Sequence, residues 1–74
     1  MTHHYLLVLA RILAEARGVS LSTVSRWATS GSNRLLFDRL AAGHGCNTKT
    51  LDRAAAWFAE HWPPDLEWPS GVPR

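Results

Sequence analysis

The stretch that decides the fold reads LAEARGVSLSTVSRW and covers residues 13–27. Its first part continues a run of apolar residues spaced as on one face of a helix. Gly18 can end that helix, because glycine readily adopts the positive φ angle of a helix C-terminus. Ser20 has the side chain of a helix N-cap, and a second helical pattern follows it. The stretch therefore predicts two helices joined by a tight turn, with the small Ala14 where they cross.

Apolar residues recur at helical spacing in four segments, and no strand pattern competes with them. We expect helices over residues 5–16 and 21–29, a third capped by Ser32 or Asn33 and ending near residue 42, and a fourth from Asn47 or Thr48 to about residue 62. The expected inward-facing residues are Leu6, Leu9, Ala10, Leu13, Leu21, Val24, Trp27, Ala28, Leu36, Phe37, Leu40, Leu51, Ala54, Ala55, Phe58 and Trp62. The fold class is therefore all-α, a compact four-helix domain over residues 1–62.

The C-terminal segment, residues 63–74, contains all four prolines and the pairs Trp62-Pro63 and Trp68-Pro69. Proline cannot continue a helix, so Pro63 and Pro64 end the fourth helix and the tail is irregular. We expect Leu66 or Trp68 to fold back onto the helices, because an exposed indole beside an apolar surface gains by packing on it.

Composition favours one ordered domain: 74 residues, 46% of them hydrophobic and 19% charged. Cys46 is the only cysteine, so an internal disulfide is excluded. No apolar run approaches the roughly 20 residues of a membrane span, and no convincing signal peptide is present. We therefore expect a cytoplasmic protein.

The net charge of +2 is unevenly distributed. Residues 1–43 hold five arginines against Glu15 and Asp38, whereas residues 44–74 hold three basic and four acidic side chains. This division suits a basic face in the first half of the chain that meets phosphate, although ordinary solvated arginines would give the same count.

The decisive stretch resembles a helix-turn-helix, and its part GVSLSTVSRW is similar to the turn and recognition helix of many bacterial regulators. In this first register the residues that would read DNA are Ser20, Ser22, Thr23 and Arg26.

A second register covers more of the chain and is the one that the sequence favours. The segments FDRLAAG (37–43) and TLDRAAAWF (50–58) resemble the end of the recognition helix and the following helix of the small phage repressor and Cro family. The resemblance implies a lambda-repressor-like domain in which residues 21–29 form the supporting helix, Gly31 makes the turn and the third helix reads DNA. The chain departs from the family pattern in two respects. Gly31 follows Ala28 by three residues where the family usually shows four, so the turn is shortened, and the supporting helix contains no glutamine.

In the second register the residues expected at DNA are Arg26, Ser30, Ser32, Asn33, Arg34, Asp38 and Arg39. Arg34 is suited to guanine, because its guanidinium can donate two hydrogen bonds to O6 and N7. Asn33 would cap the helix or pair with adenine, and the serines at the turn can hold phosphate. The resemblance implies a sequence-specific transcriptional regulator of the phage or prophage repressor type that binds double-stranded DNA in a bacterial or phage-infected cell. We expect a homodimer, with Trp57, Trp62 and Trp68 at the dimer or partner surface.

Other chemistry finds little support. His3 and His4 lie at a chain end without fixed geometry, and His44 and Cys46 lack further ligands at suitable spacing, so we expect no metal, cofactor or enzymatic activity. The alternative function is a small protein-binding module, for example a phage-borne inhibitor of a host protein, that uses the helical scaffold and the aromatic tail. A contiguous basic face would favour DNA, and a bare aromatic patch would favour a protein partner.

Overall fold

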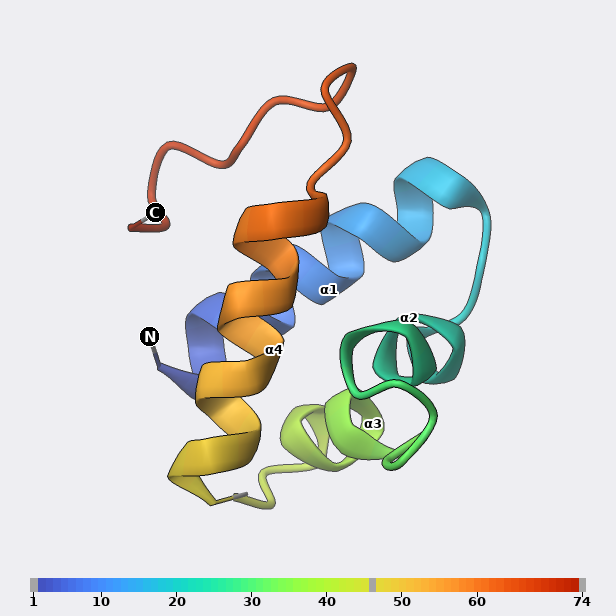
Figure 1. Cartoon of the computed structure of the whole chain (residues 1–74), viewed down its shortest axis with the longest axis vertical. Coiled ribbons are helices and arrows are strands. Elements are labelled where there is room, and N and C mark those ends of the chain that lie inside the picture. Colours follow the sequence, from blue (N-terminus) through green and yellow to red (C-terminus); the bar gives the residue numbers. More distant parts are fainter. Residues whose placement is uncertain (1, 46, 74) are drawn as a thin grey trace.

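Four helices follow one another along the chain and pack around one another (Figure 1). The computed structural model describes residues 2–45 and 47–73. Its helices are α1 (His3–Arg17), α2 (Leu21–Ala28), α3 (Leu36–Ala41) and α4 (Thr48–His61), and the described residues contain no strand. The all-α expectation is confirmed.

Three of the four helices begin at a side chain that caps them locally. The side chain of Thr2 accepts a hydrogen bond from the backbone N–H of Tyr5, and Ser20 does the same for Thr23. Asn47 caps α4 by accepting from the Thr50 N–H at 2.8 Å. Each of these bonds satisfies an N–H that has no partner inside its own helix, so the expected caps Ser20 and Asn47 are confirmed.

The core gathers one face of every helix. α1 supplies five of the fourteen buried apolar residues that the structure describes, more than any other helix. α4 crosses α1 in Figure 1, and the shorter α2 and α3 pack beside them. The buried apolar residues are Leu6, Leu9, Ala10, Leu13, Ala14, Val24, Ala28, Leu36, Phe37, Leu40, Ala54, Phe58, Trp62 and Val72. The helical spacing therefore identified most of the core correctly, and Leu21, Leu51 and Ala55 are half-buried at its margin.

Trp27 is the exception among the expected core residues. Its side chain is 38% exposed, although Val24 and Ala28 on the same helix are buried. The core under α2 is already closed by those smaller residues, and the indole instead stacks on Trp57 of α4, with ring centres 6.5 Å apart. The prediction that Trp27 is buried is wrong.

The third helix begins at Leu36, two or three residues later than predicted, and neither Ser32 nor Asn33 caps it. Thr29 prevents an earlier start, because its hydroxyl donates to the Ser25 carbonyl and accepts from the Asn33 N–H at 3.0 Å. The Ser32 side chain also does not cap α3, since its hydroxyl donates instead to the Thr29 carbonyl at 2.8 Å. The chain between α2 and α3 is thus a folded loop.

A residue of α2 provides the missing cap of α3. The Ser25 hydroxyl is fully buried, donates to the Leu21 carbonyl at 2.9 Å and accepts from the backbone N–H of Phe37 at 3.1 Å. Leu35, which precedes the helix, makes no side-chain capping bond. The start of α3 is therefore determined by packing against α2.

The tail contains the same turn twice. In each copy a tryptophan is followed by proline, and its indole N–H donates at 2.8 Å to the carbonyl four residues on: Trp62 to Leu66 and Trp68 to Val72. The two indoles then meet edge to face, with ring centres 5.1 Å apart. Leu66 and Trp68 are half-buried against the core and Val72 is buried in it, so these side chains of the tail pack on the helices.

Within the described residues, none of the helices has both the length and the apolar character that crossing a bilayer requires.

Candidate nucleic-acid interface

The connection between α1 and α2 is a turn of three residues, Gly18 to Ser20. Gly18 has φ 66° and ψ 36°, the left-handed conformation that a residue with a side chain adopts only at a cost. Its N–H donates to the Glu15 carbonyl at 3.3 Å, and the N–H of Val19 donates to the Ala14 carbonyl at 2.9 Å. These bonds satisfy the last carbonyls of α1 and turn the chain directly into the N-cap of α2.

The first turn of α2 presents a cluster of hydroxyl groups. The Ser20 Oγ lies 3.4 Å from the Ser22 Oγ and 3.2 Å from the Thr23 Oγ1. Ser22 and Thr23 are half-buried, and Arg26 is exposed one turn further along the helix. This face combines hydroxyls that donate and accept with a guanidinium that donates a bidentate fork, which are the groups used to read base edges in the major groove.

The residues expected to read DNA in the second register lie in a different setting. Asn33 and Arg34 belong to the loop of residues 29–35 and precede α3. That loop contains two successive positive φ angles, at Ser30 and Gly31.

α3 is only six residues long, and Asp38 and Arg39, which offset each other in charge, are exposed on it. The structure therefore places none of the expected base-reading residues on the first turn of a long third helix.

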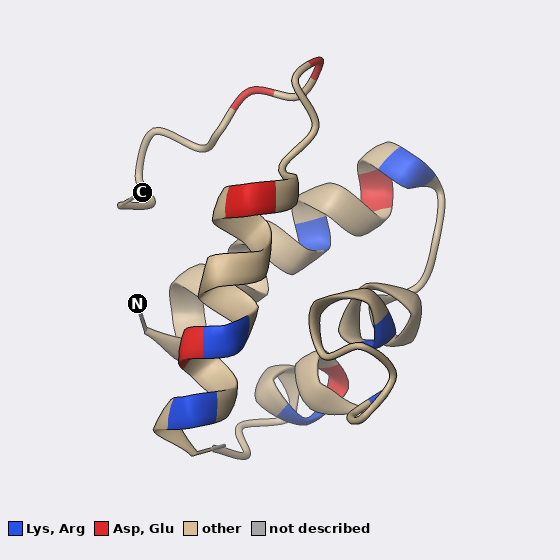
Figure 2. Cartoon of the chain, viewed as in Figure 1, with Lys and Arg blue, Asp and Glu red and all other residues tan. Residues whose placement is uncertain are grey.

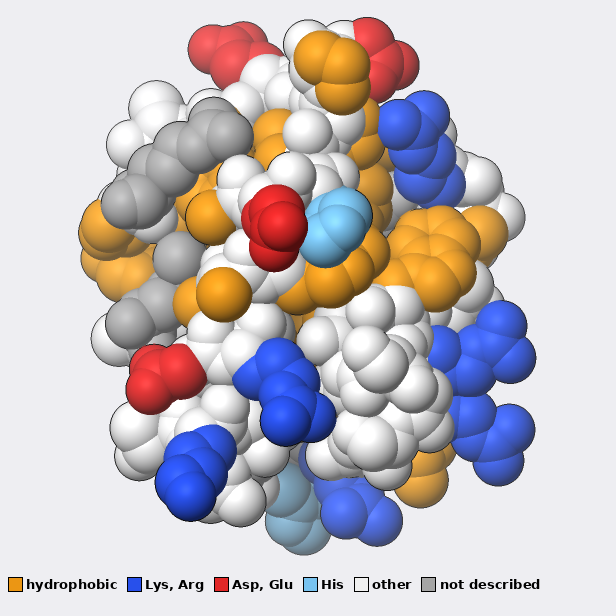
Figure 3. Space-filling model, in the orientation of Figure 1, with side chains coloured by type: hydrophobic (Ala, Val, Ile, Leu, Met, Phe, Trp, Pro, Cys, Tyr) orange, Lys and Arg blue, Asp and Glu red, His pale blue; other side chains and the backbone are white. Residues whose placement is uncertain are grey.

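Basic side chains gather on one half of the molecule. Figures 2 and 3 show a group of them along the edge formed by α2, α3, the loop between them and the start of α4, whereas Arg11 and Arg17 lie on α1. Residues 19–53 hold five basic side chains against two acidic ones; the basic residues are Arg26, Arg34, Arg39, Lys49 and Arg53. The acidic side chains Glu60, Asp65 and Glu67 lie on the end of α4 and on the tail. Basic side chains thus outnumber acidic ones along this edge, with Asp38 and Asp52 as the two acidic residues in the same range.

Lys49 and Arg53 were missed by the sequence reasoning, which assigned the second half of the chain a net negative charge. Both are exposed in the first two turns of α4, and Thr48 and Thr50 stand beside Lys49. The sequence did carry a signal for them, because both lie at the start of a predicted helix that follows a glycine-rich loop. They extend the basic edge from α2 and α3 to α4.

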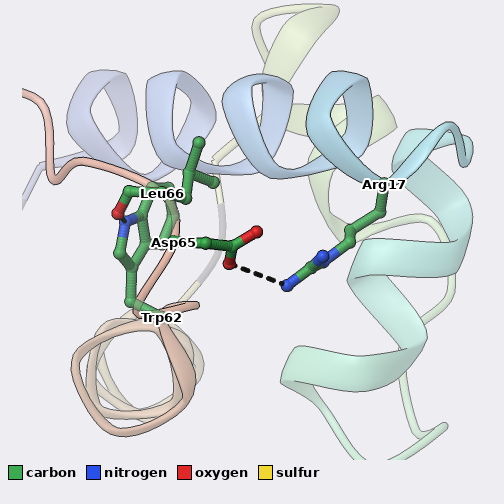
Figure 4. Close-up of polar contacts among 4 residues, drawn as sticks. All are labelled: Arg17, Trp62, Asp65 and Leu66. Atoms are coloured by element: carbon green, nitrogen blue, oxygen red, sulfur yellow. Dashed lines mark hydrogen bonds and ion pairs between the residues drawn. The ribbon is translucent and has the colours of Figure 1, made fainter.

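The three tryptophans expected at a dimer or partner surface lie in two places. Trp62 and Trp68 pack together at the tail, and Trp57 stacks on Trp27. Trp62 is buried, and both Trp62 and Trp68 donate their indole N–H groups within the tail. Figure 4 shows Trp62 with Leu66 beside the end of α1, where Arg17 and Asp65 form an ion pair at 3.6 Å. Trp57 and Trp68 are both half-buried, and Trp57 stacks on the exposed Trp27.

The described residues contain no group of three or more histidine, cysteine, aspartate or glutamate side chains that could hold a metal ion. His3 and His44 are exposed, and Cys46 lies outside the described residues.

No known protein family, curated protein or solved structure was found to match this chain. Its function is therefore inferred from its own residues.

Proposed function

We propose that this protein is a sequence-specific DNA-binding transcriptional regulator in which α1 and α2 form the helix-turn-helix and α2 is the recognition helix. The observation that carries the proposal is the three-residue turn at Gly18, since helix-turn-helix units join two helices by a turn of three or four residues that often contains glycine. The polar face of α2 lies directly after this turn, where a recognition helix reads DNA.

Three features support α2 over α3 as the helix that enters the major groove. α2 begins at its own N-cap residue, Ser20, whereas α3 has no side-chain cap from the residue that precedes it and is two residues shorter. Seven residues separate α2 from α3, which is longer than the turn of a helix-turn-helix. Finally, Asn33 and Arg34 precede α3. The lambda-repressor-like arrangement, with α3 as the reader, is the competing assignment and predicts different effects of substitution.

The roles of the side chains follow from their chemistry. Arg26 contacts a guanine through O6 and N7, and Ser22 and Thr23 hydrogen-bond to neighbouring base edges. Arg34, Arg39, Lys49 and Arg53 contact phosphates along the basic edge, which positions the protein without reading sequence.

The test is a selection from randomised duplex DNA, followed by titration of the full chain on the selected sequence at several salt concentrations. We expect one sequence family to be enriched and log affinity to fall linearly with log salt, by about 0.9 for each phosphate neutralised. Failure to enrich a sequence, or binding no tighter than micromolar at low salt, would overturn the proposal.

We also propose that the protein binds DNA as a homodimer, because one eight-residue recognition helix covers few base pairs. A selected site with two-fold symmetry and half-sites about 10 bp apart, or a small multiple of that, is the expected result. Sedimentation of the complex with one monomer per duplex would contradict it.

One observation favours the protein-binding alternative. An open cleft of about 530 Å³ lies between the start of α1, α4 and the tail, and its lining is mostly apolar: Thr2, Tyr5, Ala55, Ala56, Ala59, Trp68 and Pro73. None of the described residues that line this cleft is charged, and the cleft lies apart from the α2 face. The alternative predicts that the selection enriches no DNA sequence.

A further inference from the structure

Trp27 is a large apolar side chain on a polar helix face. It follows Arg26 directly and lies one turn after Thr23, so it borders the face that is proposed to read DNA. Only Trp27 and Leu35 are large hydrophobic residues classed as exposed in the described part of the chain. Because Val24 and Ala28 close the core beneath α2, burial in the core does not explain an indole at this position.

The indole of Trp27 is held in place by a row of stacked rings. Its ring stacks on Trp57 of α4, with centres 6.5 Å apart and planes inclined by 29°. Trp57 in turn stacks on His61 at 5.2 Å and meets Phe58 edge to face at 5.3 Å. Figure 3 shows a hydrophobic patch between α2 and α4 with basic side chains beside it. The ring is therefore ordered before any ligand binds, which lowers the entropic cost of using it as a contact.

The major groove offers a single kind of apolar group to such a ring. Base edges there expose hydrogen-bond donors and acceptors, and the C5-methyl group of thymine is the exception. The Trp27 ring can therefore pack against a thymine methyl group while the adjacent Arg26 hydrogen-bonds to the edge of a neighbouring purine. A protein partner would bury the ring as well, but the flanking arginines favour an anionic partner.

We propose that Trp27 determines specificity by packing against the C5-methyl group of one thymine in the binding site, beside the base pair that Arg26 contacts. The inference rests on the proposed function and deepens it, because it names a base that the α2 face prefers. The stacked Trp57 and His61 act as positioning residues that keep the Trp27 ring at the groove.

The test replaces each thymine of the selected duplex in turn by deoxyuridine, which removes the methyl group and leaves base pairing intact. For the wild-type protein we expect one position in each half-site at which affinity falls about fourfold, the value for withdrawing one methyl group from a contact. That position should adjoin the base pair at which Arg26→Ala relaxes specificity. Trp27→Ala should bind the thymine and deoxyuridine duplexes equally, whereas the matched exposed variant Leu35→Ala should keep the fourfold difference.

A purely bracing role for Trp27 predicts another pattern. Trp27→Ala would then weaken binding to both duplexes by the same factor and keep the difference between them, which would overturn the inference. If Trp27→Ala fails to fold by circular dichroism, the scan with wild-type protein decides: no thymine with a methyl effect would overturn the inference as well. Failure of the proposed function is distinguishable, because then no DNA sequence is selected at all.

Discussion

Removal of the Ser25 hydroxyl is expected to destabilise the whole domain, because this buried group hydrogen-bonds α2 to the start of α3. It accepts from the backbone N–H of Phe37 at 3.1 Å and is completely buried. In Ser25→Ala the Phe37 N–H, in the first turn of α3, keeps neither this partner nor access to water. An unsatisfied buried donor costs about 1–3 kcal/mol. For a domain of this size each kcal/mol shifts the melting temperature by about 4–8 °C, so we expect a fall of roughly 5–20 °C.

Thermal and urea unfolding followed by circular dichroism measure this effect, and Ser22→Ala is the matched control. Ser22 lies on the same helix, and its hydroxyl has only a 3.4 Å contact with the Ser20 Oγ. We expect the free energy of unfolding of Ser22→Ala to lie within about 0.5 kcal/mol of the wild-type value, as is usual for surface substitutions. Equal stability of Ser25→Ala and the wild type, or equal losses in both variants, would refute the view that α3 is capped from α2.

Three further substitutions test other parts of the fold. Gly18→Ala should lower the free energy of unfolding by about 1–2 kcal/mol in urea titrations. The new Cβ would clash with no atom, but φ is +66°, a backbone conformation that is strained for alanine. The control Gly71→Ala, at a position without a positive φ, should be nearly neutral. Trp62→Phe should cost about 1–2 kcal/mol in the same assay, since it removes the 2.8 Å bond to the Leu66 carbonyl, and an unchanged midpoint would contradict that bond. Asp65→Asn should change stability by less than about 1 kcal/mol, because the ion pair it makes with α1 is exposed; a larger loss would show that this pair anchors the tail.

The parts of the fold that depend on neighbours in sequence were predictable. Gly18, Ser20 and Asn47 act through hydrogen bonds that span three to five residues, so their roles follow from residue type and position. The helical spacing of apolar residues likewise located most of the core. The start of α3 was not predictable in this way, because it depends on Ser25, twelve residues earlier.

Two features of the candidate site also depend on contacts between helices. Trp27 has the sequence spacing of a core residue, but smaller side chains on α2 already close the core and the indole lies outside it. The basic edge combines Arg26 with Lys49 and Arg53, which are more than twenty residues apart in sequence. A count of charge along the chain places Arg26 in the basic first half and Lys49 and Arg53 in the acidic second half. The packing of α4 beside α2 brings the three residues to one side of the molecule.

The central claim, that α2 reads DNA, is tested most directly by the base preferences of Arg26→Ala and Arg34→Ala. Both side chains are exposed, so both variants should keep wild-type helicity. The measurement is the affinity of each protein for every single-base variant of the selected duplex. We predict that Arg26→Ala loses about 1–3 kcal/mol of discrimination at one base pair in each half-site, and that Arg34→Ala weakens binding to all sequences alike. The reverse result would assign reading to the segment around α3, and unchanged binding in both variants would contradict DNA recognition by either helix.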